Sequence, residues 1–228
     1  MFLLTSLALA APLAPVVDSQ PAGSFSLSMA GSTRTDHSRQ KDCDTGQCLA
    51  LVVDNGGRGI VEYRPLSFLS VWGELGWSIE TVRSASYRGN GLLYGAGLKV
   101  GVPIRPMIGV DAWLGYTAWT TAEPNKMEDH RRSELDAGAA LRLGSSDDGL
   151  VAWVGPVVNP WSSSELSALN GAVPLSLAPR LPISAMAGLA IYSNPLGPAW
   201  TEKGRISFGA GFTLGNRIGG DCWLGFVW

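Results

Sequence analysis

The sequence has few charged residues, few histidines and no long apolar run. Charged residues make up 16% of the 228 positions, the formal net charge is −2, and there are two histidines. Without a basic stripe to attract phosphates, nucleic-acid binding is not expected. Beyond the first eleven residues, no segment approaches about 18 uninterrupted apolar residues, which excludes a transmembrane helix there. Yet 46% of the residues are hydrophobic and 9 are tryptophan, which is unusual for a soluble domain. Any membrane crossing must therefore be made by strands.

The N-terminus has the composition of an export signal. Residues 1–11 are almost wholly apolar, and Ala8-Leu9-Ala10 is a small-x-small cleavage site. This predicts a signal peptide over residues 1–10 and a single mature domain over residues 11–228. The segment lacks Lys and Arg before its apolar run, so a buried N-terminal helix remains the alternative.

Cysteine is scarce as well. Cys43 and Cys48 lie in the polar stretch DCDTGQC, which in an oxidising compartment favours a local disulfide. Two thiols with no third or fourth ligand nearby make a poor zinc site, so no metal or cofactor is expected. Cys222 is left over as a small apolar residue.

Alternation of apolar with polar or small residues dominates the chain from about residue 49. In Leu69–Glu80 the odd positions are apolar apart from one glycine, whereas the even positions include Glu74, Ser78 and Glu80. Successive side chains of a strand point to opposite faces, so this segment has one apolar and one polar face. The same parity recurs in residues 94–104, 135–143 and 206–214.

These segments predict an all-β fold, a single up-and-down antiparallel transmembrane β-barrel of about ten strands. The strands are expected near residues 25–31, 49–63, 68–81, 92–103, 107–120, 134–144, 149–160, 180–192, 204–215 and 220–228. Short turns alternate with longer polar loops around 32–48, 82–91, 121–133 and 161–179. Counts of eight or twelve strands stay open for the region after Pro160. The competing fold is a soluble lipocalin-like barrel, with its apolar face inside.

Outward aromatic residues on this parity form two groups at different heights. They are Trp77, Tyr94 and Tyr116 near the long loops, and Phe25, Tyr63 and Trp228 near the short turns. Two such girdles are expected where a barrel meets the two membrane interfaces.

The last segment, Asp221–Trp228, has apolar residues at alternate positions and ends on an aromatic residue. It resembles the C-terminal strand of bacterial outer-membrane β-barrel proteins, in which the last residue is usually Phe. The resemblance implies a Gram-negative outer-membrane location, contact with outer-membrane lipid and recognition by the barrel-insertion machinery. It also implies that the short turns lie in the periplasm and the long loops outside. No specific family is indicated.

The inward parity carries charges of both signs, in nearly equal numbers. Twelve charged side chains are expected to face the lumen: Asp54, Arg58, Glu62, Arg64, Glu74, Glu80, Lys99, Asp111, Glu134, Asp136, Arg142 and Arg205. Mutual pairing in a plugged bore is favoured, because unpaired charges away from water are costly. Inward glycines such as Gly97 and Gly115 would leave space for small solutes, whereas inward tryptophans such as Trp72 and Trp113 would fill it. Pore and plug both stay open.

Candidate catalytic residues are few. His37 and His130 are both expected in external loops. Asp129-His130 with Glu128 is a candidate acid–base pair, although the basic residues around it favour a solvated charged loop. No Gly-x-Ser-x-Gly elbow is present. We therefore expect a non-enzymatic, porin-like barrel, either structural or a narrow passive channel for small solutes. The alternatives are a surface enzyme acting on lipid or peptide and an adhesion barrel that uses its external loops.

Overall fold

The computed structural model describes residues 22–40, 49–83, 86–123, 128–168, 175–179, 183–193 and 204–228. Its strands are β1 (Phe25–Gln40), β2 (Leu49–Leu66), β3 (Leu69–Val82), β4 (Tyr87–Arg105), β5 (Ile108–Glu123), β6 (Glu128–Ser145), β7 (Leu150–Ala168), β8 (Leu175–Pro179), β9 (Ile183–Tyr192), β10 (Arg205–Gly215) and β11 (Arg217–Val227). The expected signal peptide and the expected Cys43–Cys48 disulfide lie outside the described residues. No helix among the described residues is long and apolar enough to cross a membrane.

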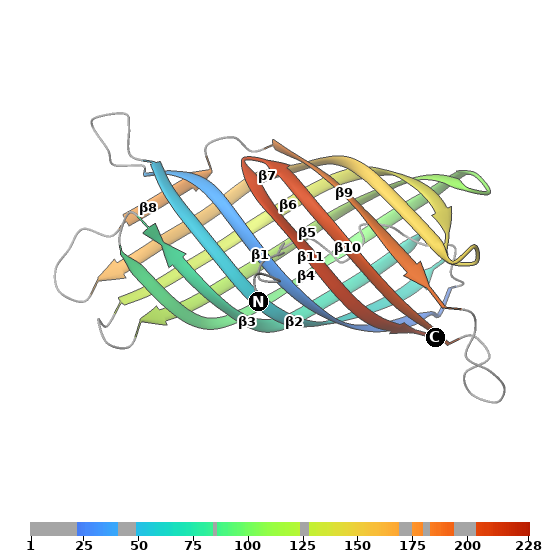
Figure 1. Cartoon of the computed structure of the whole chain (residues 1–228), viewed down its shortest axis with the longest axis horizontal. Coiled ribbons are helices and arrows are strands. Elements are labelled where there is room, and N and C mark those ends of the chain that lie inside the picture. Colours follow the sequence, from blue (N-terminus) through green and yellow to red (C-terminus); the bar gives the residue numbers. More distant parts are fainter. Residues whose placement is uncertain are drawn as a thin grey trace, which may run out of the picture.

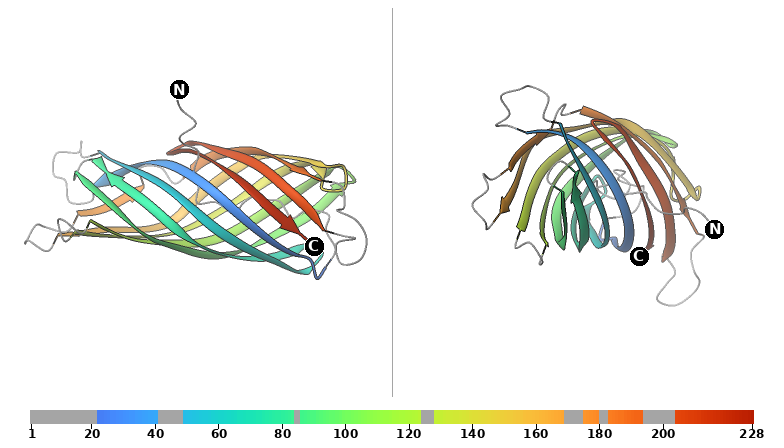
Figure 2. Two further views of the ribbon diagram at one scale, coloured as in Figure 1. Left: turned by 60° about the horizontal axis from the view of Figure 1, so that its bottom comes forward. Right: turned by 60° about the vertical axis from the view of Figure 1, so that its left-hand side comes forward.

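The strands form a closed antiparallel barrel (Figures 1 and 2). Each long strand pairs with the next long strand along the chain, and β11 returns to pair with β1 from Ser26↔Val227 to Asp36↔Arg217. The wall therefore contains ten long strands, with the short β8 added at one end. This confirms the predicted up-and-down barrel and its count of ten.

The strands extend further than predicted at the end that carries the long connections. β1 continues to Gln40, β4 starts at Tyr87, β6 starts at Glu128 and β7 continues to Ala168. The predicted loops at 32–48, 82–91, 121–133 and 161–179 are therefore partly strand. The boundaries were wrong because the outward residues of these extensions, such as Thr35 and Arg131, are themselves polar. Where both faces are polar, alternation disappears from the sequence.

The outer face is apolar and the inner face is polar. On β3, Leu75, Trp77 and Ile79 point outward and are exposed, whereas Glu74 and Ser78 point inward and are buried. A soluble lipocalin-like barrel would have the opposite arrangement. The exposed aliphatic wall is what a barrel surrounded by lipid requires.

Leu75→Arg tests this assignment of the two faces. Leu75 lies near the middle of β3 and is 61% exposed, so the substitution places a cation in hydrocarbon. We expect the free energy of unfolding to fall by about 2–4 kcal/mol, measured by urea titration of the barrel refolded in phospholipid vesicles. Leu75→Met, which keeps the position apolar, is the control. A Leu75→Arg variant as stable as the control would mean that this face is in water.

The short strand β8 completes the wall beyond the ends of the last three strands, on the side of the long connections. β9, β10 and β11 are shorter than their neighbours, and β8 fills the space above them by pairing with both β7 and β1. Its partners on β7 are Glu165 and Leu166, while β9 pairs with β7 only up to Val158. Among the described pairings, β7 residues 159–164 thus have no partner on this side, and Pro160 has no N–H to donate.

Candidate functional site

The bore contains nearly all the charged side chains that the sequence placed there. Of the twelve predicted lumen charges, Glu62 and Arg205 are partly buried. The others are buried: Asp54, Arg58, Arg64, Glu74, Glu80, Lys99, Asp111, Glu134, Asp136 and Arg142. The bore also holds charged residues that the sequence interpretation missed, namely Arg34, Asp36, Arg132, Arg217 and Asp221. Most of these lie on the strand extensions that were taken for loops.

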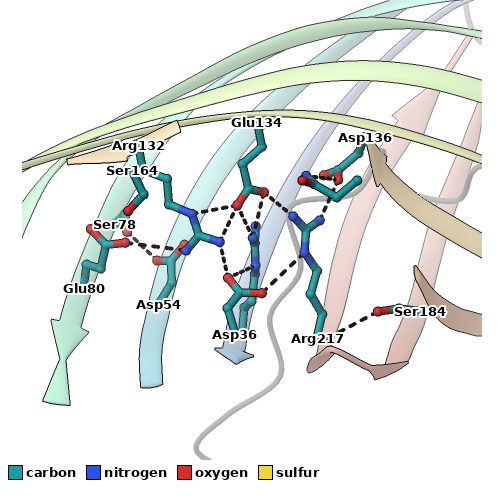
Figure 3. A network of polar contacts seen from close by, with 12 residues as sticks. Asp36, Asp54, Ser78, Glu80, Arg132, Glu134, Asp136, Ser164, Ser184 and Arg217 are labelled. Atoms are coloured by element: carbon teal, nitrogen blue, oxygen red, sulfur yellow. Dashed lines mark hydrogen bonds and ion pairs between the residues drawn. The ribbon is translucent and has the colours of Figure 1, made fainter. Parts of the chain in front are cut away.

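Ion pairs cross the bore in the half that carries the long connections (Figure 3). β1 and β6 are five strands apart in either direction around the barrel, so they face each other across the lumen. Arg34 on β1 donates to both carboxylate oxygens of Glu134 on β6, at 2.6 and 2.7 Å. In the opposite sense, Arg132 on β6 pairs with Asp36 on β1. We call Arg34, Asp36, Arg132, Glu134 and Arg217 the cross-bore network.

Arg217 joins the cross-bore network from a third strand. Its two terminal nitrogens lie 2.5 Å from Glu134 Oε2 and 2.7 Å from Asp136 Oδ1. The tight β10–β11 turn places it there, and that turn needs Gly215, whose φ is +140°. A Cβ at Gly215 would lie 2.9 Å from the Cα of Ser184, so the turn is closed to other residues.

Trp119 packs against the cross-bore network. The guanidinium carbons of Arg34 and Arg132 both lie 5.3 Å from the centre of its ring. A cation over an aromatic face is attracted by the ring quadrupole, and more strongly where water is excluded. Trp119 is 1% exposed, so it fixes both arginines in their pairing positions.

Other inward charges pair at other levels of the bore. The distances between the charged nitrogen and the carboxylate oxygen are 3.2 Å for Arg58–Glu74, 2.6 Å for Lys99–Glu62 and 3.0 Å for Arg142–Asp111. Most of these groups are almost wholly buried. A buried charge persists only when it is paired and hydrogen-bonded, so the pairing explains how so many charges can be buried in one bore.

Inward tryptophans cover inward glycines on neighbouring strands. A Cβ added at Gly97 or at Gly115 would come within 2.7 Å of the ring of Trp72. In the same way, Trp113 covers Gly138, Trp153 covers Gly188 and Trp223 covers Gly209. Rings that lie over glycines in this way fill the space the missing side chains leave. The glycines are therefore packing positions for tryptophan and not the lining of an open path.

A separate polar chain lies near the end of the barrel that carries the long connections. His130 Nδ1 is 2.6 Å from Glu80 Oε2, and His130 Nε2 is 2.8 Å from Ser164 Oγ. Thr121 donates to Glu80 over 3.0 Å and also contacts the hydroxyl of Tyr87 at 2.9 Å. The Tyr87 ring packs edge-on against His130, with 5.8 Å between ring centres.

The prediction that His130 lies in a solvated external loop was wrong. It is on β6, points into the bore and is fully buried. Asp129 cannot pair with it, because adjacent residues of a strand face opposite sides. The side chain of Glu128 lies outside the described side chains, and so does that of His37. The backbone of His37, in β1, pairs with Leu51 of β2.

The six aromatic residues of the predicted girdles lie in two groups along the strands. Phe25 is half-buried, packing 4.7 Å from Trp228 and pairing with Tyr63, at the end that holds the short turns. Trp77, Tyr94 and Tyr116 are exposed on neighbouring strands of the other half. Trp161, which was assigned to a loop, joins them by stacking on Tyr116 at 6.5 Å between ring centres.

No protein-family model matches this sequence, and no curated protein matches it. Solved structures do resemble the fold. The translocator domain of the autotransporter NalP from Neisseria meningitidis is 10% identical, with a TM-score of 0.51 over 93% of this chain and 90% of that one. An outer-membrane channel from Pseudomonas putida F1 is 12% identical, with a TM-score of 0.37 over 92% and 97%. The attachment invasion protein Ail of Yersinia pestis is 12% identical, with a TM-score of 0.32 over 91% and 99%. The chain thus has the fold of an outer-membrane β-barrel.

Proposed function

We propose that this chain is an integral structural protein of the bacterial outer membrane, with a bore that is closed and does not conduct solutes. The observation that supports this most directly is the cross-bore network, in which β1 and β11 are tied to β6 on the far side of the lumen. Export through a signal at residues 1–10 belongs to the same proposal.

Burial of the inward charges argues against an aqueous channel. The charges that line a water-filled pore would remain in contact with water, whereas Arg34, Lys99 and Glu134 are 1%, 2% and 1% exposed. The tryptophans that cover glycines add a second obstruction. A closed bore leaves the external end, where β1 to β7 extend furthest, as the part able to meet other molecules.

Planar-bilayer recording of the refolded barrel tests the proposal. We expect no steady conductance at neutral pH, with a general porin inserted under the same conditions as the positive control. A steady ohmic conductance would reject the closed barrel and support a narrow passive channel for small solutes.

The C-terminal strand supports a second part of the proposal, recognition by the barrel-insertion machinery. Trp228 is the last residue, is 46% exposed and packs on Phe25 and Phe226. We expect Trp228→Ala to slow assembly several-fold in vesicles that contain the machinery, followed as heat-modifiable migration on a gel. Trp228→Phe should assemble like the wild type. Equal assembly rates for Trp228→Ala and the wild type would remove this role.

A further inference from the structure

We propose that Ser164, His130 and Glu80 form a nucleophilic triad at the external end of the bore, with acyl esters as its substrates. The three residues come from β7, β6 and β3. The His130 ring joins the other two, with 2.8 Å from Nε2 to Ser164 Oγ and 2.6 Å from Nδ1 to Glu80 Oε2. This goes beyond a structural role and does not depend on whether the bore conducts.

The two ring nitrogens of His130 have the different partners that nucleophilic catalysis needs. Nδ1 lies against a carboxylate, so it carries the proton, and Nε2 is left to accept the hydroxyl proton of Ser164. Glu80 is itself held by Thr121. The carboxylate, the imidazole and the hydroxyl therefore form one directed chain, not separate contacts.

Arg132 supplies a hydrogen-bond donor beside the serine. It lies directly opposite Ser164 in the β6–β7 register. Its Nε and Nη2 bind Glu134 and Asp36, but Nη1 is buried and has no hydrogen-bond partner among the described residues. Nη1 lies 3.7 Å from Glu80 Oε1, which is too long for a hydrogen bond. A buried donor without an acceptor is uncommon, and an oxyanion that forms at Ser164 would provide one.

Ser164 is also the member of the triad closest to solvent. It keeps 6% exposure, whereas His130 and Glu80 have none. It lies at the end of the β7 stretch that has no described partner strand on one side. Trp161, at the outer aromatic group, precedes it by three residues on the same strand, roughly 10 Å along the chain. The hydroxyl therefore lies near the level at which lipid headgroups meet water.

The surroundings favour an acyl group. Val82 and Leu166 follow Glu80 and Ser164 by two residues on their strands, so they share the inward face, and they pack with Val52 and Tyr87 in an apolar cluster. A fatty-acyl chain that enters beside Ser164 would first meet Leu166, which at 7% is the most exposed of the four. A polar peptide would find fewer partners there.

The reaction follows from these positions. Ser164 Oγ attacks the ester carbonyl carbon as its proton passes to His130 Nε2, and the carbonyl oxygen becomes an oxyanion beside Arg132. When the oxyanion collapses, the ester C–O bond breaks and the leaving alkoxide takes the proton from His130. Water, deprotonated by His130, then attacks the acyl-serine, which releases a carboxylic acid and restores the serine hydroxyl.

The test uses the full chain refolded in detergent micelles. A fluorescent fluorophosphonate is expected to label Ser164, located by peptide mass, and the protein is expected to hydrolyse a short-chain nitrophenyl ester. Ser164→Ala should abolish labelling, and His130→Ala and Glu80→Gln should slow it by roughly 100-fold or more. Ser162→Ala, two residues away on the same strand, is the matched control and should label like the wild type. Heat-modifiable migration identifies the folded fraction of each variant.

Each result decides the proposal. Absence of labelling in folded wild-type protein would overturn it, as would labelling that survives Ser164→Ala or is unaffected by His130→Ala. Phospholipid vesicles with labelled acyl chains identify the source of the ester. Release of fatty acid indicates a membrane lipid, whereas hydrolysis of the nitrophenyl ester alone indicates a soluble ester. Bilayer conductance is measured separately, so failure of the closed barrel and failure of the triad are distinguishable.

Discussion

Glu134→Gln is expected to lower the free energy of unfolding by about 3–5 kcal/mol and to produce intermittent conductance. Glu134 is the carboxylate that Arg34, Arg132 and Arg217 share. A neutral amide would remove one of the negative charges that balance three buried guanidinium groups. Their mutual repulsion would then act across the lumen, between β1, β6 and β11. The measurements are urea unfolding in phospholipid vesicles and planar-bilayer recording at neutral pH.

The control for this variant is Glu165→Gln on β7. Glu165 is exposed on the outer face, and substitutions of that kind usually change stability by less than about 0.5 kcal/mol. A double variant, Arg34→Met with Glu134→Gln, should be less destabilised than the sum of its single variants, because the two residues contact each other. If Glu134→Gln is as stable as Glu165→Gln and shows no openings, the network does not close the bore.

The membrane-embedded half of the barrel could be predicted from the sequence, because one strand face must be apolar there. Alternation in residues 69–80 located β3 and the inward direction of Glu74 and Glu80. It also gave the strand order, since each strand of an up-and-down barrel pairs with its sequence neighbour. The inward direction of the charged side chains in this half follows from the alternation alone.

The external half could not be predicted in the same way. Beyond the lipid, strands such as the start of β6 carry charge on both faces, so His130 and Arg132 inside and Arg131 outside resemble a charged loop. Partial information was present, since His130, Arg132, Glu134 and Asp136 follow one parity. The pairing of Arg34 with Glu134 required more, because it joins residues 100 positions apart through the closure of the whole barrel. The contact of Ser164 with His130 depends equally on the β6–β7 register.

The cross-bore network and the tryptophans that cover glycines close the bore by different means, and this difference is testable. The network relies on directional ion pairs, so loss of one carboxylate leaves the remaining charges unbalanced. The tryptophans rely on shape, since each ring occupies the volume that a glycine leaves. The free energy of unfolding should therefore depend on the side-chain volume at the tryptophan and at the glycine that it covers.

Trp72→Ala is expected to cost about 3–5 kcal/mol of stability, the usual range for removal of a buried aromatic side chain. Trp72 is 5% exposed and its ring covers both Gly97 and Gly115. Gly115→Ala by itself should cost about 1–3 kcal/mol, because the added Cβ would lie 2.7 Å from the Trp72 ring. Gly59→Ala is the control, since its added Cβ would have no atom nearer than 3.9 Å.

The decisive result is the sign of the effect of Gly115→Ala in the two backgrounds. All three of the nearest atoms to a Cβ at Gly115 belong to Trp72, and the third is 3.9 Å away, so nothing else obstructs it. In the Trp72→Ala background the same substitution should be neutral or stabilising, since alanine loses less conformational entropy in a strand than glycine does. Urea unfolding of the four proteins in vesicles gives the coupling energy. An equal cost in both backgrounds would show that the Trp72 ring does not occupy the space over Gly115, and this level of the bore would then have room for a solute.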